Sequence, residues 1–202
     1  MNRGRLEAFS DGVFAILITI TMLELRVPAG FTWHALQPEV PVFFTYAVSF
    51  AYIGIYWNNH HHLLKACHRV NARIMWANQV LLFSLSLFPF ATGWAGRNPL
   101  REAPTVLYGC VLLAAAISFF TLQTFIVTGE GGATSDLAKA LGKDRQGRMS
   151  LAIYAVAVGL AFVAPWVAAL LYVVVALIWL VPDRRIEKAL IEAEREDSAS
   201  GS

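Results

Sequence analysis

The residue types that could carry chemistry gather around one short motif near the amino terminus. Arg5, Ser10 and Asp11 open the first apolar stretch, and a pair of histidines, His60 and His61, stands near the end of the second. A carboxylate and an imidazole can exchange protons near neutral pH, and a carboxylate in a membrane can also attract a cation. The two kinds of chemistry that these residues support are therefore proton handling and cation conduction.

Three consecutive histidines, residues 60–62, also raise the question of a metal site. Consecutive side chains on a helix point about 100° apart, so the three imidazoles cannot reach one ion together. The sequence has no HxxxH or HExxH spacing, and its two cysteines, Cys67 and Cys110, form no CxxC motif. We therefore expect neither a resident metal nor a cofactor.

The elements that must position these residues are membrane-spanning helices. Of the 202 residues, 57% are hydrophobic and only 15% are charged. Runs without Asp, Glu, Lys or Arg cover residues 40–64, 74–96 and 103–129, and each reaches the roughly 20 residues that a bilayer crossing needs. The net charge of +2 is too small to indicate a nucleic-acid partner. The expected environment is the lipid bilayer.

The first apolar stretch, residues 5–24, differs from these runs because charged residues bracket it closely. Only twelve uncharged residues separate Asp11 from Glu24, and as a helix they would rise about 18 Å against a hydrocarbon thickness of about 30 Å. Such a helix cannot face lipid alone, so other helices or water must cover its charged ends. We expect it to be an inner, functional element.

The last apolar run, residues 149–182, has 34 uncharged residues and is too long for one span. Pro165 divides it, which predicts a helical hairpin with its turn at residues 164–166. Six spans then put thirteen lysines and arginines on one side of the membrane and three on the other. Since positive residues favour the cytoplasmic side, we expect both termini in the cytoplasm.

The fold class that results is an all-α integral membrane protein with six transmembrane helices, multi-pass in the inner cell membrane. The expected spans are residues 5–24, 42–64, 74–94, 105–128, 149–164 and 166–182. Residues 1–197 are expected to form one domain, in which residues 183–197 extend the last span as a short charged helix. Residues 198–202 are expected to be a flexible tail.

This topology brings polar groups of three spans to one depth near the cytoplasmic face. Asp11 lies there on the first span, His60 and His61 on the second, and Asn78 on the third. An ionised carboxylate at that depth is costly unless it is paired or hydrogen-bonded, so we expect Asp11 to bond with these donors. The network either ties the helices together or takes part directly in conduction or proton sensing.

One apolar stripe runs along the first helix. Ile16, Thr19, Ile20 and Leu23 follow the spacing i, i+3, i+4 and i+7 and so share a face. In most proteins such a stripe only packs against neighbours. On a helix too short to face lipid, it is also compatible with a water-filled axis, where large aliphatic side chains would make a constriction that gates by dewetting.

Three motifs, taken in order, resemble a known family. They are Arg5-x-x-x-Phe9-Ser10-Asp11 at the start of the first span, Tyr56-Trp57-x-x-His60-His61, and Asn78 with Pro89-Phe90-Ala91-Thr92. This pattern resembles the bacterial members of the transmembrane protein 175 family, potassium channels of the lysosomal or endosomal type. The motifs cover the first three spans closely, and the length and span count fit throughout.

The resemblance implies a homotetramer in which the first helix of each subunit lines a central pore. It implies a pore without the carbonyl filter of other potassium channels, and no TVGYG-like segment occurs here. By position, Ile16 corresponds to the hydrophobic constriction, Thr19 to a threonine associated with potassium preference, and Leu23 to a second apolar ring. In some relatives the residue at the position of Ile20 lines the pore, and in others the residue at the position of Thr19 does so. Arg5, Ser10 and Asp11 would form a network with His60 or His61 and Asn78.

The leading hypothesis is thus a passive potassium channel, weakly selective over sodium, and not an enzyme. The alternative is a small proton-coupled secondary transporter in which Asp11 and a histidine carry protons. Against the alternative, the sequence lacks the internal repeats and interrupted spans common in such transporters. A membrane enzyme built on the histidine cluster comes third, because neither a nucleophile nor a second ligand motif supports it.

Overall fold

The computed structural model describes residues 2–132 and 145–180, and within these ranges every regular element is a helix. The elements are α1 (Arg3–Met22), η1 (Trp33–Glu39), α2 (Val40–Lys65), α3 (Ala72–Ser86), α4 (Phe88–Arg97), α5 (Glu102–Gly129), α7 (Arg145–Ala161) and α8 (Pro165–Leu180). The expected charged helix at residues 183–197 and the tail at 198–202 lie outside the described residues.

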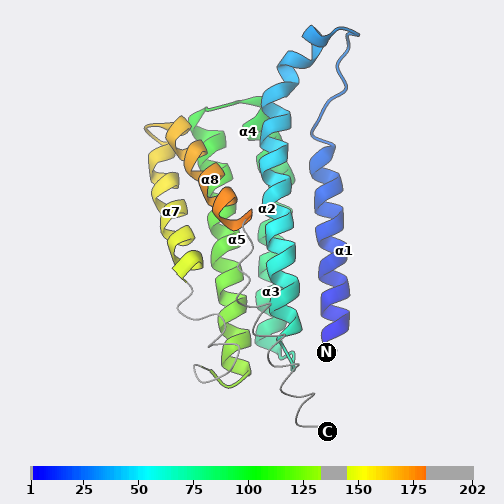
Figure 1. The fold of residues 1–202 in the computed structure, drawn as a ribbon, viewed down its shortest axis with the longest axis vertical. Coiled ribbons are helices and arrows are strands. Elements are labelled where there is room, and N and C mark those ends of the chain that lie inside the picture. Colours follow the sequence, from blue (N-terminus) through cyan, green and yellow to red (C-terminus); the bar gives the residue numbers. More distant parts are fainter. Residues whose placement is uncertain (1, 133–144, 181–202) are drawn as a thin grey trace.

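The helices form an elongated bundle with α1 at one edge and α7 at the opposite edge (Figure 1). α5 packs against α3, α4 and α7, α8 packs against α7, and α1 packs mainly against α2 with further contacts to α4 and α3. The core lies between α2, α3 and α5, where side chains such as Tyr52, Leu81 and Leu112 are fully buried. Among the described elements α1 has neighbours on one side only, and half of its residues are exposed.

Three stretches of the described chain are long and apolar enough to cross a membrane: Trp33–Lys65, Ala72–Arg97 and Glu102–Gly129. They contain the uncharged runs 40–64, 74–96 and 103–129. α8 is apolar but has only 16 residues, which rise about 24 Å and so fall short of a hydrocarbon core of about 30 Å. The long apolar helices make this an all-helical protein of the membrane type.

The third expected span, residues 74–94, is broken into two helices. α3 ends at Ser86 and α4 begins at Phe88, with Pro89 in the first turn of α4. Proline has no backbone N–H and its ring clashes with the carbonyl four residues earlier, whereas the first turn of a new helix tolerates it. The expected span is therefore interrupted at Leu87, while Ala72–Arg97 as a whole is long and apolar enough to cross a membrane.

The predicted hairpin in the last apolar run is confirmed. α7 ends at Ala161 and α8 begins at Pro165, one residue from the expected start. The turn is closed by backbone hydrogen bonds from Val163 and Ala164 to the carbonyl of Leu160, at 3.0 and 2.7 Å. Proline suits the start of α8 because the first N–H groups of a helix have no partner within it.

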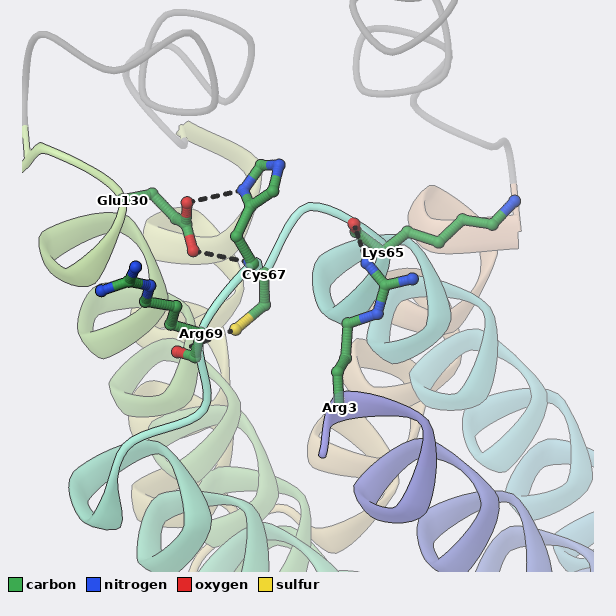
Figure 2. A network of polar contacts seen from close by, with 6 residues as sticks. Arg3, Lys65, Cys67, Arg69 and Glu130 are labelled. Carbon is green, nitrogen blue, oxygen red and sulfur yellow. Dashed lines mark hydrogen bonds and ion pairs between the residues drawn. The ribbon is translucent and has the colours of Figure 1, made fainter. Parts of the chain in front are cut away.

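The two ends of the bundle carry different polar contacts. At the end that holds the amino terminus, the Arg3 guanidinium donates to the Lys65 carbonyl at 3.0 Å, and Arg69 lies at the same end beside Glu130 (Figure 2). There the backbone N–H and Nδ1 of His68 both donate to the Glu130 carboxylate at 2.7 Å. At the other end, Arg97 forms an ion pair with Glu24. Basic residues that the sequence places on one side thus meet at one end.

A candidate pore helix and its polar anchors

α1 begins at a capped amino terminus and has two contrasting faces. The Asn2 side chain accepts a hydrogen bond from the Gly4 N–H at 3.1 Å, which satisfies one of the free donors of the first turn. The residues buried by the bundle are Leu6, Ser10, Phe14, Leu17 and Thr21. The stripe residues Ile16, Thr19, Ile20 and Leu23 are all exposed on the opposite side, at 56% for Ile16, 44% for Ile20 and 79% for Leu23.

A chain of three hydrogen-bonded side chains joins the buried face to the bundle. Asn78 Nδ2 donates to Ser10 Oγ at 3.0 Å, and Asn78 Oδ1 lies 2.7 Å from His60 Nε2. Ser10 Oγ donates its own proton to the Leu6 carbonyl at 2.9 Å. All three side chains are fully buried. The contacts therefore tie α1, α2 and α3 together at one depth.

The order of donors in this chain fixes the histidine tautomer. Because Ser10 uses its proton on the Leu6 carbonyl, it can only accept from Asn78, and the amide oxygen of Asn78 must face His60. His60 Nε2 then carries the proton, and Nδ1 is left as a buried nitrogen with no hydrogen-bond partner among the described residues. The Phe14 ring covers the imidazole at a centroid distance of 5.5 Å. A neutral His60 fits this dry environment.

The two carboxylates of α1 contact α2 in a second, partly exposed row. Asp11 Oδ1 accepts a hydrogen bond from Trp57 Nε1 at 3.0 Å, and Glu7 Oε1 lies 3.1 Å from His61 Nδ1. The rings of Trp57 and His61 are stacked at a centroid distance of 6.2 Å. Glu7 and Asp11 are four residues apart, as are Trp57 and His61, so two matched pairs meet across the helix interface.

The structure brings together some of the predicted site residues and separates others. Ser10, Asn78 and His60 meet, as expected. Asp11 differs from the expectation, because its donor is the indole of Trp57 rather than a histidine or Asn78. Arg5 is exposed and makes no side-chain hydrogen bond or ion pair within residues 2–132 and 145–180. Phe9 is also exposed, at 54%.

The physical reason for these differences is helical spacing. His60 and His61 point about 100° apart, so one enters the core while the other lies at the edge beside α1. Glu7 and Trp57 complete this edge and were not among the predicted site residues. The signal that could have found them is the shared spacing of four, Glu7 with Asp11 and Trp57 with His61. The described residues contain no cluster of three potential metal ligands.

The sequence of the anchored helix is shared with known channels. Residues 5–89, which hold most of α1 and all of α2 and α3, match the family described as endosomal/lysosomal potassium channel TMEM175. A potassium channel of Chryseobacterium sp. strain P1-3 is 48% identical over 192 residues, covering 95% of this chain and 100% of that protein. The chain belongs to the TMEM175 family of ion channels.

Structure and more distant relatives agree with this membership. The crystal structure of a lysosomal potassium-selective channel TMEM175 homolog from Chamaesiphon minutus has a TM-score of 0.75 and 28% identity, covering 89% of this chain and 96% of that one. The endosomal/lysosomal proton channel TMEM175 of Bos taurus is 30% identical over 179 residues, covering 80% of this chain and 37% of that protein. TMEM175 relatives are thus named for potassium and for protons.

Proposed function

We propose that this TMEM175 protein is a passive potassium channel, weakly selective over sodium, in which copies of α1 surround the pore. The observation that carries the proposal is the two-sided construction of α1. One face is buried and hydrogen-bonded to α2 and α3, while Ile16, Thr19 and Leu23 stand uncovered in line on the other. A homotetramer would cover this face around a shared axis and enclose a route for ions.

The chemistry of the exposed face suits a weakly hydrated cation. The Thr19 hydroxyl donates to the Ile16 carbonyl at 2.9 Å, so its proton is used within the helix and its oxygen lone pairs remain outward. Ile16, one turn away, supplies only methyl and methylene groups. A narrow ring of such side chains with few oxygen ligands requires partial loss of hydration water, which costs less for potassium than for sodium. Selectivity obtained in this way is modest.

The membrane topology in this proposal has six spans, with α1, α2, the α3–α4 pair, α5, α7 and α8 crossing in turn. Both termini lie in the cytoplasm of a cell whose inner membrane holds the protein. Supporting this, Arg3, Lys65 and Arg69 gather at one end of the bundle, and basic residues favour the cytoplasmic side (Figure 2). Residues 1–197 then form a single channel domain.

The decisive experiment is ion flux from liposomes that contain the purified protein. We expect potassium to leave the liposomes faster than sodium, with caesium as a further comparison, and we expect single-channel currents in planar bilayers.

Ile16→Asn should raise conductance, because an amide at the constriction lets water enter. Ile117→Asn, the same change at an exposed position of α5, should leave conductance unchanged. Vesicles that stay tight to every alkali cation would refute the proposal.

The proton-coupled transporter remains the second candidate, because Glu7, Asp11 and His61 form a partly exposed acidic and imidazole row on α1 and α2. It has a weak point, since the hydrogen-bond partner of Asp11 is an indole, which cannot accept a proton. Single-channel currents that exceed the rate of ion transfer in a transporter's turnover cycle would exclude the transporter.

A further inference from the structure

The outer end of α1 is held by a specific contact with α4. Glu24, two residues beyond the last residue of α1, accepts a hydrogen bond from Arg97 Nη2 on its Oε2 at 2.7 Å. The same guanidinium nitrogen lies 3.4 Å from the Glu24 carbonyl oxygen. Both side chains are partly covered, with 39% of Arg97 and 25% of Glu24 exposed. The carboxylate is therefore turned toward α4 and away from the exposed stripe that ends at Leu23.

Gly93 provides the space in which this carboxylate lies. It stands four residues before Arg97 on α4, so the two positions share a helix face. A Cβ atom at Gly93 would overlap Glu24 Oε2. The glutamate thus crosses the bare backbone of α4 to reach Arg97, and any larger residue at position 93 must displace it.

α4 is itself fixed in the bundle, which makes this contact a rigid one. Ser49 Oγ lies 2.7 Å from Thr92 Oγ1 and 2.8 Å from Tyr108 Oη, and all three hydroxyls are buried between α2, α4 and α5. At Gly96, a Cβ atom would come within 2.8 Å of the Val42 Cα on α2. Residues on both sides of Gly93 therefore hold α4 closely against its neighbours.

The charges at this end of the described chain balance. The three basic residues Arg26, Arg97 and Arg101 and the three acidic residues Glu24, Glu39 and Glu102 all belong to this end. Arg26, Glu39 and Arg97 also line one shallow hollow beside α4. Because the formal charges of these six residues sum to zero, loss of one arginine leaves one uncompensated carboxylate per subunit.

We propose that Arg97 and Gly93 are positioning residues that hold the Glu24 carboxylate against α4 and neutralise it, and thereby set the electrostatic potential at the outer mouth of the pore. This inference rests on the proposed function, in which α1 lines the pore. A freed carboxylate at the end of α1 would raise the local concentration of potassium, since a negative mouth attracts cations. The pair as built keeps the mouth neutral.

The test is single-channel conductance of Arg97→Gln at low and high ionic strength. At about 0.01 M salt the Debye length is about 30 Å, and at about 1 M it is about 3 Å. We expect conductance to rise on the order of twofold at low salt for potassium that enters from the Glu24 side, and to match the wild type at high salt. An unchanged conductance, or a change that persists at high salt, would overturn the inference and leave Arg97 with a purely structural role.

Two further variants separate charge from structure. Glu24→Gln should lower conductance at low salt, because it leaves Arg97 uncompensated, and the Glu24→Gln, Arg97→Gln double variant should return to the wild-type value. Gly93→Ala should raise low-salt conductance without any change in net charge, because the added methyl group displaces the carboxylate from Arg97. A double variant that differs from the wild type at low salt would contradict the charge mechanism.

The matched control is Arg101→Gln, which removes the same charge from the same end. Arg101 is exposed, and its side chain forms no ion pair within the described ranges. The effect of Arg101→Gln on conductance should therefore be smaller than that of Arg97→Gln. An equal effect would contradict a specific role for Arg97.

Failure of the proposed function gives a different result from failure of this inference. In the first case the wild type carries no potassium current; in the second it does, but its conductance is insensitive to the Glu24–Arg97 pair.

Discussion

The inward face of α1 carries Ser10, Phe14 and Thr21, all buried, whereas its outward face carries Ile16, Ile20 and Leu23, all largely exposed. Both faces therefore carry large apolar side chains, but only the inward face is covered by the bundle and buries the hydroxyls of Ser10 and Thr21 in hydrogen bonds. The buried hydrogen bonds through Asn78 have fixed directions, so they set the rotation of α1 about its own axis. The direction of each outward side chain follows from that rotation.

The largest difference between the faces should appear when one large side chain is truncated on each. Phe14→Ala leaves a cavity beside His60, and such changes cost about 3 to 5 kcal/mol of unfolding free energy. Ile16→Ala on the exposed face should cost only about 0.5 kcal/mol, as is usual for surface sites. Denaturant unfolding in detergent micelles measures both. Similar losses for the two variants would show that the outward face is also packed.

The next largest effect should come from the hydrogen bonds that join Ser10, Asn78 and His60. Asn78→Ala removes the partner of both Ser10 and His60, and leaving buried polar groups unpaired costs about 1 to 3 kcal/mol. The neighbouring Gln79 is exposed, so Gln79→Ala is the matched control and should leave stability unchanged. The same unfolding measurement applies, and equal effects of the two substitutions would contradict an anchoring role for Asn78.

The sharpest comparison makes one chemical change on both faces. Thr19→Val should lower the potassium-to-sodium permeability ratio in bilayer recordings. It should change the unfolding free energy by less than about 0.5 kcal/mol, because the hydroxyl that it removes is exposed, although that hydroxyl donates to the Ile16 carbonyl. Thr21→Val removes a buried hydroxyl that donates to the Leu17 carbonyl at 2.6 Å, and it should cost about 1 kcal/mol of unfolding free energy with an unchanged permeability ratio. An unchanged ratio for Thr19→Val would remove Thr19 from the selectivity mechanism.

Much of this architecture is predictable from the sequence because a bilayer restricts the choices. Uncharged runs of sufficient length and a dividing proline at Pro165 indicate where helices begin and end. Pro89 is the same kind of signal, but residues 74–96 fit a single span, whereas the 34 residues of the run 149–182 do not, so only the second run requires a break by its length. The break between α3 and α4 was therefore missed.

The contacts of individual side chains are less predictable. Spans at one depth bring Ser10, Asn78 and His60 close in principle, and the structure joins them. Which of several donors meets Asp11 depends on helix rotation, which hydropathy does not specify; the donor is Trp57. Contacts between residues far apart in the sequence, such as Arg97 with Glu24, depend on how α1 and α4 pack, which hydropathy does not specify either.

The smallest expected effect comes from the contact between His68 and Glu130. This contact involves neither face of α1, so it serves as a control for the comparison. Burial alone would raise the pKa of Glu130, but hydrogen bonds from the backbone N–H and imidazole of His68 outweigh it and lower that pKa. A carboxyl whose pKa is lower in the folded state stabilises the fold above its ordinary pKa, about 4.3 for glutamate. That stabilisation is lost as the pH falls through the lowered pKa.

We therefore expect amide hydrogen exchange at residues 66–71 to quicken as the pH drops below about 4.3, beyond the intrinsic pH dependence of exchange. Amides of α1 should not follow, since the hydrogen bonds of Glu130 within the described ranges join the segment after α2 to the end of α5 (Figure 2). Glu130→Gln should speed exchange at neutral pH and remove the acid transition. If α1 loosens together with residues 66–71, its anchoring depends on this end of the bundle as well as on Asn78, and the separation of the two faces is less complete than the buried contacts indicate.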